Sequence, residues 1–189
     1  MWALVESNNI TEIISHPRGV TVGDVQYPKN IFEQWSASEL EAIGYYKVTI
    51  DESNLKDPHY YANGELTYSF GSGAATGSYA SATAKPLDDV LWLESDDKPA
   101  GVSTGDLRSQ GLKNLHKKQV NYEAKGLLEP YDWYTLRAAD GGTAVPSNIA
   151  TYRAAIRTKA NSMASSIDGV SDVDALKALY PIDWPELGS

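Results

Sequence analysis

Residues 132–157 have the sequence DWYTLRAADGGTAVPSNIATYRAAIR, and the pattern changes twice along this stretch. Its aromatic start predicts an extended segment over residues 132–137, because Trp and Tyr are enriched in strands. The two adjacent glycines predict a reversal, and Pro146 is suited to the start of a helix. Beyond it, apolar residues recur every three or four positions, so we expect a long amphipathic helix up to about Ile167.

The apolar face of this expected helix is continuous. It consists of Ile149, Tyr152, Ile156, Ala160, Met163 and Ile167. Arg153, Arg157 and Lys159 fall off that face, as expected for the side of a helix that meets solvent. Ser171 is suited to cap a further short helix. The inward-facing residues expected of that last helix are Val173, Leu176 and Leu179.

Helix-forming residues also dominate the segment from Thr104 to Leu128. The inward face expected there is formed by Leu112, Leu115, Tyr122 and Gly126. A cationic group gathers in the same segment and comprises Arg108, Lys113, Lys117 and Lys118. Two interpretations stay open for it: a site for an anion or an acidic partner, or the solvated face of a helix.

The first 86 residues carry β signals instead. Two β-prone runs flank residues 7–9, which predict a hairpin turn. Asn63-Gly64 predicts a second hairpin, since this dipeptide is the strongest short hairpin signal. Between them, residues 38–41 match a capping box of Ser38 and Glu41, and predict a short helix that Gly44 ends.

These patterns predict an α+β protein with an N-terminal antiparallel β-rich module followed by a C-terminal helical module. The expected boundaries are 1–86 for the β-rich module, 87–105 for a linker and 106–189 for the helical module. The linker is expected because residues 94–99 are charged and turn-forming.

Composition excludes several classes of function. The net charge is -9, so the chain lacks the basic surface that nucleic-acid binding requires, and we expect no nucleic-acid partner. The chain has no cysteine, which removes disulfides, thiolate metal sites and thiol nucleophiles together. No apolar run approaches the roughly 20 residues that cross a bilayer, so we expect no membrane partner and a soluble protein made in a cytoplasm.

The aromatic residues are biased toward those with a polar tip, with 12 Tyr and 5 Trp against 2 Phe. Tyr and Trp suit half-buried positions and are enriched at protein interfaces. Small β domains also place Tyr on strand faces. The bias therefore suggests contact surfaces, with strand packing as the alternative.

No residues are spaced for catalysis or for binding a metal or cofactor. The three histidines lie in separate segments without ligand spacing, and the adjacent acids at 88–89 and 96–97 do not share a face. Residues 71–77 are glycine-rich but lack the Gly-Lys-Ser/Thr of a phosphate loop, so we expect a flexible hairpin or interdomain loop there. We expect no enzyme, and keep a glycan-acting hydrolase only as a remote alternative.

One motif resembles a known family. It comprises Asp132-Trp133-Tyr134-Thr135, a turn, Val145-Pro146, Ile149, Tyr152-Arg153 and Ile156-Arg157. It resembles the C-terminal motif of tail-fibre assembly proteins and related small tail proteins of tailed bacteriophages, over about residues 110–165. Residues 27–35 and 39–44 are similar to an N-terminal module found in small tail-region and virion proteins of marine phages.

This resemblance implies a non-enzymatic structural protein of a tailed phage virion, associated with the tail or tail fibres. It implies protein–protein contacts with other tail or fibre proteins, several identical copies, and a place in the virion after synthesis in the host cytoplasm. The alternative is a tail-fibre assembly chaperone that is absent from the mature virion. The chain also departs from the family, because its β-rich part is larger and a further helix and a Pro181–Pro185 tail follow the motif.

Five residues are the expected protein contacts. They are Trp133, Tyr134, Tyr152, Arg153 and Arg157. For Trp133 and Tyr152, packing in the core is an equally good interpretation, because a residue on an apolar stripe normally faces the core.

Overall fold

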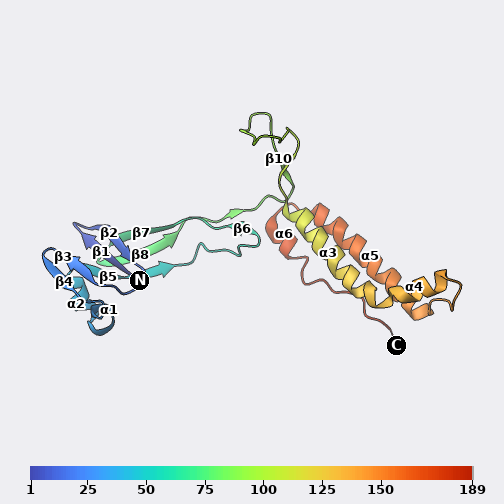
Figure 1. Cartoon of the computed structure of the whole chain (residues 1–189), viewed down its shortest axis with the longest axis horizontal. Helices are drawn as coiled ribbons and strands as arrows, with labels where there is room; N and C mark the ends of the chain where they lie inside the picture. Colours follow the sequence, from blue (N-terminus) through green and yellow to red (C-terminus); the bar gives the residue numbers. More distant parts are fainter. Residues whose placement is uncertain (189) are drawn as a thin grey trace. The chain divides into compact units, whose positions relative to one another are not determined.

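The computed structural model describes residues 1–188, which divide into two compact units. The first unit, Met1–Thr83, is built mainly of strands, and the second, which begins at Ala84, mainly of helices (Figure 1). The predicted α+β class, with a β-rich N-terminal part followed by helices, is confirmed.

The first unit is organised around a five-stranded sheet with the order β2-β1-β5-β8-β7. Its strands are β1 (Trp2–Glu6), β2 (Asn9–Ile14), β5 (Tyr45–Asp51), β7 (Leu66–Gly71) and β8 (Ala74–Tyr79). All neighbours are antiparallel except β5 and β8, which run parallel. The connection from β5 to β8 contains β7. Strands β7 and β8 form an antiparallel hairpin, and β7 is the edge strand of the sheet.

Two tight turns form the hairpins of this sheet. Ser7 and Asn8 have φ values of 51° and 62°, which give the β1–β2 turn the twist that a two-residue hairpin loop needs and confirm the predicted turn. Ser72 and Gly73 have φ values of 52° and 75° and join β7 to β8 in the same way. The glycine-rich segment is therefore a hairpin turn that leads directly into strand β8.

The hairpin predicted at Asn63-Gly64 is wrong. The preceding strand, β6 (Tyr61–Ala62), pairs with β9 (Thr83–Ala84) and not with β7. The Asn63 side chain instead accepts a hydrogen bond from the Lys56 amide and donates one to the Lys56 carbonyl, each at 2.9 Å. Asn63 thus holds a neighbouring loop, which removes it from the role of a hairpin residue.

The segment around Gly23 is a short hairpin. Gly23, at φ 58°, makes a turn between β3 (Val20–Val22) and β4 (Val25–Tyr27), which form their own two-stranded sheet. Two short helices follow, α1 (Ile31–Gln34) and α2 (Ala37–Ala42).

The capping box of α2 lies two residues earlier than predicted. Ser36 is the N-cap, its amide donates to Glu39 Oε2 at 2.8 Å, and the Glu39 amide donates back to Ser36 Oγ at 3.3 Å. The sequence offers Ser-x-x-Glu twice. The earlier copy is used because the N-cap position directly follows Trp35, whose ring packs on Tyr27. Gly44 follows the helix at φ 87°, as expected for a glycine that ends it.

The sheet buries apolar side chains on both faces, because successive residues of a strand point to opposite sides. One face packs with the short helices and the β3–β4 hairpin, through Ile14, Val20, Ile31, Phe32, Leu40 and Tyr45. The other face buries Ala3, Val48 and Ala75, with Tyr68 and Phe70 partly buried against them.

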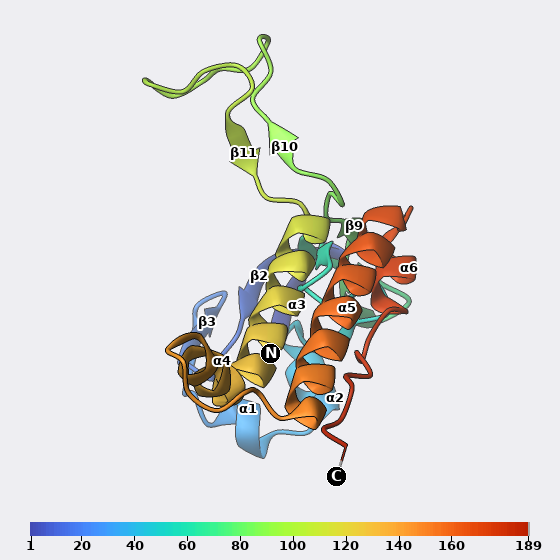
Figure 2. The ribbon, with the colours of Figure 1, turned by 90° about the vertical axis from the view of Figure 1, so that its right-hand side faces the viewer.

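The second unit is organised around two long helices that lie side by side and run in opposite directions (Figure 2). Its helical elements are α3 (Leu112–Leu128), the 3₁₀ turn η1 (Glu129–Tyr131), α4 (Asp132–Ala139), α5 (Ser147–Gly169) and α6 (Val173–Lys177). The six residues of the predicted α5 stripe are all buried, which confirms that prediction.

The inward face predicted for α3 is correct at Leu112, which is buried, and wrong at Leu115, Tyr122 and Gly126. Leu115 and Tyr122 are 44% and 74% exposed. The buried residues are spaced by four and are Leu112, His116, Val120 and Ala124. A histidine can occupy this face because its Nδ1 lies 2.8 Å from the Tyr180 hydroxyl, which gives this buried ring nitrogen a hydrogen-bond partner.

The last helix begins one residue later than predicted. Asp172 caps α6 by accepting from the Ala175 amide at 2.7 Å, so Ser171 is not the N-cap. Val173 and Leu176 are buried as expected. In the tail that follows, the Trp184 indole donates to Glu123 Oε2 of α3 at 2.9 Å.

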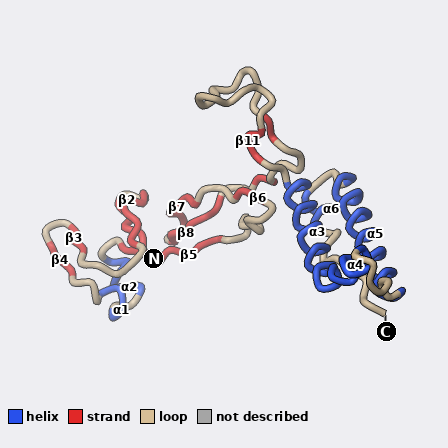
Figure 3. The backbone as a smooth tube through the Cα atoms, turned by 45° about the vertical axis from the view of Figure 1, so that its right-hand side comes forward, coloured by secondary structure: helices blue, strands red, loops and turns tan. Residues whose placement is uncertain are grey.

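Part of the expected linker is an ordered ribbon. Strand β10 (Val90–Leu91) pairs with β11 (Leu107–Ser109), and the ribbon stands off the N-terminal end of α3 (Figure 3). Asp89 fixes its base, since its two carboxylate oxygens accept from the Gly111 amide and the Asn114 side chain, each at 2.7 Å. None of the helices in residues 1–188 is long and apolar enough to span a membrane.

Candidate functional site

Helix α4 carries the most prominent residues of the motif, and it replaces the extended segment predicted over residues 132–137. Pro130 stands at the start of the turn η1, and Asp132 lies in the first turn of α4, where a negative charge favours a helix. Leu, Arg and Ala then dominate, and all three have high helix propensity. The β propensity of two aromatic residues was outweighed by these signals, so the prediction of an extended segment is wrong.

Arg153 of α5 joins this helix to the rest of the unit. Its Nη2 forms an ion pair with Asp132 Oδ1 at 2.8 Å, and its Nη1 donates to the Leu128 carbonyl at 3.0 Å. Leu128 is the last residue of α3, and the last carbonyls of a helix lack intrahelical partners. The Arg153 bridge, by which we mean Arg153 with Asp132 and Leu128, therefore ties together α3, α4 and α5.

The two buried residues of the expected contact set have internal roles. Arg153 is only 5% exposed, and its guanidinium is used within the bridge. Tyr152 is 8% exposed, and its ring meets the ring of Tyr131 edge-on at 5.4 Å. Burial raises the pKa of the Tyr152 phenol, so the neutral side chain is favoured. Both residues position η1 and α4 rather than presenting a surface.

The side chains of α4 itself form an exposed patch. The Trp133 and Tyr134 rings lie 3.8 Å apart, and the Arg137 guanidinium lies 4.8 Å from the Trp133 ring centre and 5.3 Å from that of Tyr134. Trp133 is 50% and Leu136 65% exposed. We call these four residues, Trp133, Tyr134, Leu136 and Arg137, the α4 patch.

Contacts at both ends of α4 hold the patch in place. None of the eight described residues of α4 is buried. The helix is fixed at its start by the Arg153 bridge. In its last turn, Arg137 Nε donates to the carbonyl of Thr143, which follows the helix, at 3.3 Å. Stacking of a guanidinium on aromatic rings also limits the rotamers of the patch. The result is an aromatic surface on which Trp133 and Leu136 are exposed and Tyr134 and Arg137 are half-buried.

A concave pocket lies beside the Arg153 bridge, with a cavity volume of about 370 Å³. Its lining comes from α3, from α5 and from the first residue of α4, and comprises Asn121, Ala124, Lys125, Leu128, Asp132, Arg153, Arg157, Ala160 and Asn161. Arg157, the fifth expected contact residue, lines this pocket and is exposed. The fold thus brings Asp132, Arg153 and Arg157 into one place.

Sequence reasoning did not identify the α3 side of this site. Lys125 and Asn121 lie about 30 residues from Arg153 along the chain. Because the inward face of α3 was predicted incorrectly, the sequence did not indicate that these two side chains line a pocket with α5. One signal was present: Arg153 and Arg157 are four apart and so share one side of a helix. No local pattern indicated the partner of Arg153, because Asp132 belongs to a different helix.

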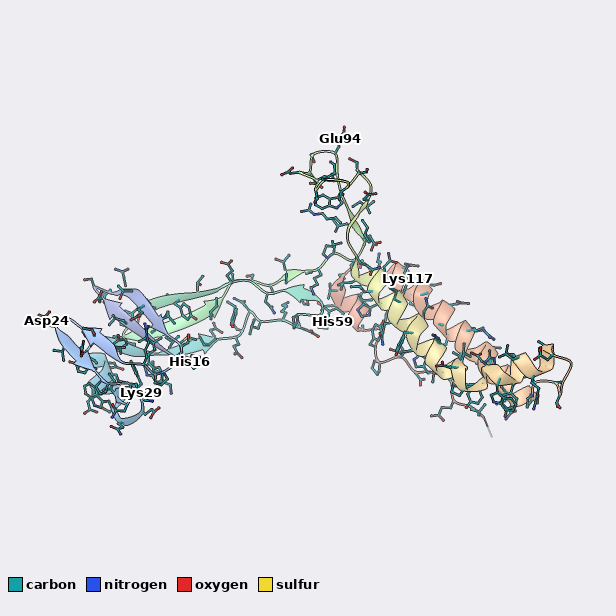
Figure 4. All side chains as sticks on the ribbon, in the orientation of Figure 1. His16, Asp24, Lys29, His59, Glu94 and Lys117 are labelled. Atoms are coloured by element: carbon teal, nitrogen blue, oxygen red, sulfur yellow. The ribbon has the colours of Figure 1, made fainter. Side chains whose placement is uncertain are left out.

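The cationic group near the start of α3 does not form a shared site. Lys113 pairs with Asp88 at 3.2 Å, Lys117 with Asp168 at 2.8 Å, and Lys118 donates to Gln110 at 3.0 Å. Arg108 stacks on the Trp92 ring, at 4.7 Å, within the ribbon that also carries Glu94 (Figure 4, where Glu94 and Lys117 are labelled). These cations are distributed among separate partners. In residues 1–188 no group of three or more acidic or histidine side chains is arranged to hold a metal ion.

Comparison with protein-family models, with curated proteins and with solved structures finds no match for this chain.

Proposed function

We propose that this protein is a non-enzymatic structural protein of a tailed phage virion, associated with the tail or tail fibres, and that it acts through protein–protein contacts. The proposal is supported by the resemblance of residues 132–157 to small phage tail proteins. It is also supported by the structure of that motif in the second unit, where its residues form the α4 patch and the Arg153 bridge that holds α4.

The observation that carries the proposal is the exposure of the α4 patch. Solvent-exposed Trp, Tyr and Arg are the side chains that contribute most to binding at protein interfaces. Trp133 and Leu136 are at least half exposed although they are large and apolar, and they neighbour one another on an ordered helix. Exposed apolar clusters of this kind mark interaction sites, whereas single exposed apolar residues need no explanation.

The partners we propose are other tail or fibre proteins and further copies of this chain. Symmetric assembly is the usual arrangement for a protein that repeats one contact surface. The Arg153 bridge fits this role, because it holds α4 in one position before binding and so reduces the entropy lost on association.

The test is protein mass spectrometry of gradient-purified, intact phage particles, quantified against the major capsid protein. A constant copy number per particle is the expected result. If the chain is found in infected-cell lysate but not in particles, the structural role is overturned and the tail-fibre assembly chaperone takes its place.

A further inference from the structure

The pocket between α3 and α5 holds an excess of positive charge in an acidic protein. The chain has a net charge of -9, yet the pocket is lined by Lys125, Arg153 and Arg157 against a single acid, Asp132. Asp132 is already paired with Arg153 at 2.8 Å. The charges of Lys125 and Arg157 are therefore not balanced within the pocket.

These two cations are directed to a common space from two different helices. Lys125 lies on α3 and Arg157 on α5, and both line the same cavity. Within residues 1–188 neither forms an ion pair or a side-chain hydrogen bond. Two like charges that face one concave space repel each other, and a bound anion would remove that repulsion.

The rest of the lining provides both polar and apolar contacts. Asn121 and Asn161 lie on the two helices, and each side chain has an amide that both donates and accepts. Ala124, Ala160 and Leu128 supply small apolar surface between them. At about 370 Å³, the cavity has room for more than a single ion and is at the lower end of the range for ligand pockets.

We propose that this pocket binds a carboxylate group, held by the guanidinium of Arg157 and the ammonium of Lys125. A carboxylate is planar and matches the fork of a guanidinium, which can donate two parallel hydrogen bonds to it. Asp132 also lines the pocket and would repel the second charge of a phosphate dianion, so a singly charged group fits better. The proposal goes beyond the proposed function and does not rest on it.

The carboxylate can come from two sources: a small free carboxylic acid, or an acidic side chain of a partner protein. Both place the same group between Lys125 and Arg157. A small acid needs only the polar contacts, whereas a partner's side chain also brings an apolar stem that can pack on Leu128.

The experiment is a titration of the ¹⁵N-labelled full chain followed by NMR, with the side-chain signals of Asn121, Asn161 and Arg157 as readouts. The probes are sodium acetate, a blocked peptide with one central Glu, and the same peptide with Gln. Sodium chloride and inorganic phosphate are added to separate samples at matched ionic strength. The variants are Arg157→Gln and Lys125→Gln, with Lys159→Gln as the matched control, since Lys159 lies on α5 but outside the pocket.

Saturable shifts with acetate or the Glu peptide, and none with the Gln peptide, are expected. Each pocket variant should weaken binding about fivefold, the loss of one partly exposed charge contact, whereas Lys159→Gln leaves it unchanged. Tighter binding of the Glu peptide than of acetate identifies a protein side chain as the source, and equal binding identifies a small acid. Equal shifts with chloride, tighter binding of phosphate, or an equal loss in Lys159→Gln would overturn the proposal.

Independent variants keep the result interpretable if one of them does not fold. Lys125 and Arg157 are both exposed, so neither substitution removes a buried contact. The α4 patch is intact in both variants. A variant that loses carboxylate binding and keeps particle association therefore supports the pocket proposal and leaves the proposed function unaffected. Loss of particle association with carboxylate binding retained bears on the proposed function alone.

Discussion

At the scale of single residues, Arg153 has the largest structural role in the second unit. A side chain 5% exposed would be costly to bury as a free charge, and its two hydrogen-bonding partners offset that cost. Because those partners belong to α3 and α4, one residue of α5 determines how three helices meet. Sequence periodicity placed Arg153 on the solvent side of the helix, and the structure shows why periodicity alone was insufficient.

We expect Arg153→Met to lower the free energy of unfolding of the helical unit by about 2–3 kcal/mol, because it leaves the Leu128 carbonyl unsatisfied and Asp132 without its partner. The loss stays below that of a fully buried pair because the Asp132 side chain is 54% exposed. Urea unfolding followed by circular dichroism at 222 nm measures it. The control is Arg157→Met, one turn later and exposed, which should change stability by less than about 0.5 kcal/mol.

Substitution of Trp133 distinguishes a role in protein contact from a role in core packing. We expect Trp133→Ala to cost about 1 kcal/mol or less in stability, because half of the side chain is exposed, and to abolish stoichiometric association with phage particles. Thermal unfolding and mass spectrometry of particles measure the two effects. The contact role is lost if folding and association both survive, and a core role is indicated if the helical unit no longer folds.

At the scale of elements, short helices depend on their first residues. The Ser36–Glu39 box satisfies two amides of α2, a helix of six residues that could not persist alone. The hydrogen bonds from the Ser36 side chain and backbone also lower the pKa of the Glu39 carboxyl. Two Ser-x-x-Glu patterns overlap here, and the packing of the preceding chain determines which one caps the helix. The contact between the Trp35 and Tyr27 rings fixes that preceding chain.

We expect Ser36→Ala to destabilise the first unit by about 1 kcal/mol and Ser38→Ala to have almost no effect, because only Ser36 caps the helix. The stability of the first unit in the two variants is compared by amide hydrogen exchange in increasing urea. A lowered carboxyl pKa contributes stability above the unfolded pKa and loses it as pH falls through the folded value. The difference between the wild type and Ser36→Ala should therefore shrink in acid; an equal cost for Ser38→Ala would contradict the assignment.

At the scale of the whole molecule, each unit has a core of its own. The sheet of the first unit buries residues on both faces, and the helices of the second bury the α5 stripe against α3. Substitution in one core is therefore expected to act within that unit, because sites that share no packing partners are usually independent.

We expect Ile156→Ala, at a position with 0% exposure, to destabilise the helical unit by about 2–5 kcal/mol through the cavity that it creates. Amide hydrogen exchange measured by NMR should show faster exchange in α3 and α5 and unchanged protection in β1, β5 and β8. Ile50→Val in the partly buried strand β5 is the reciprocal control, with a small effect confined to the sheet. Equal loss of protection in both units would show that they unfold as one.

The sequence by itself determined the features whose signals are local. The α5 stripe repeats at helical spacing from Ile149 to Ile167, within a helix of 23 residues. The Ser7-Asn8 turn and the Gly44 helix end each depend on a few neighbouring residues. These predictions hold because a backbone period or a positive φ is set by adjacent residues.

Tertiary structure alone decided the features that join distant residues. The buried face of α3 includes His116 because Tyr180, 64 positions later, accepts or donates at its ring. Asp132 and Arg153, on different helices, meet at 2.8 Å and turn an expected surface residue into a buried one. Trp133 faces solvent because α4 folds as a helix at the end of the α3–α5 pair. For His116 and Arg153, a long-range contact outweighed a local propensity worth less than about 1 kcal/mol.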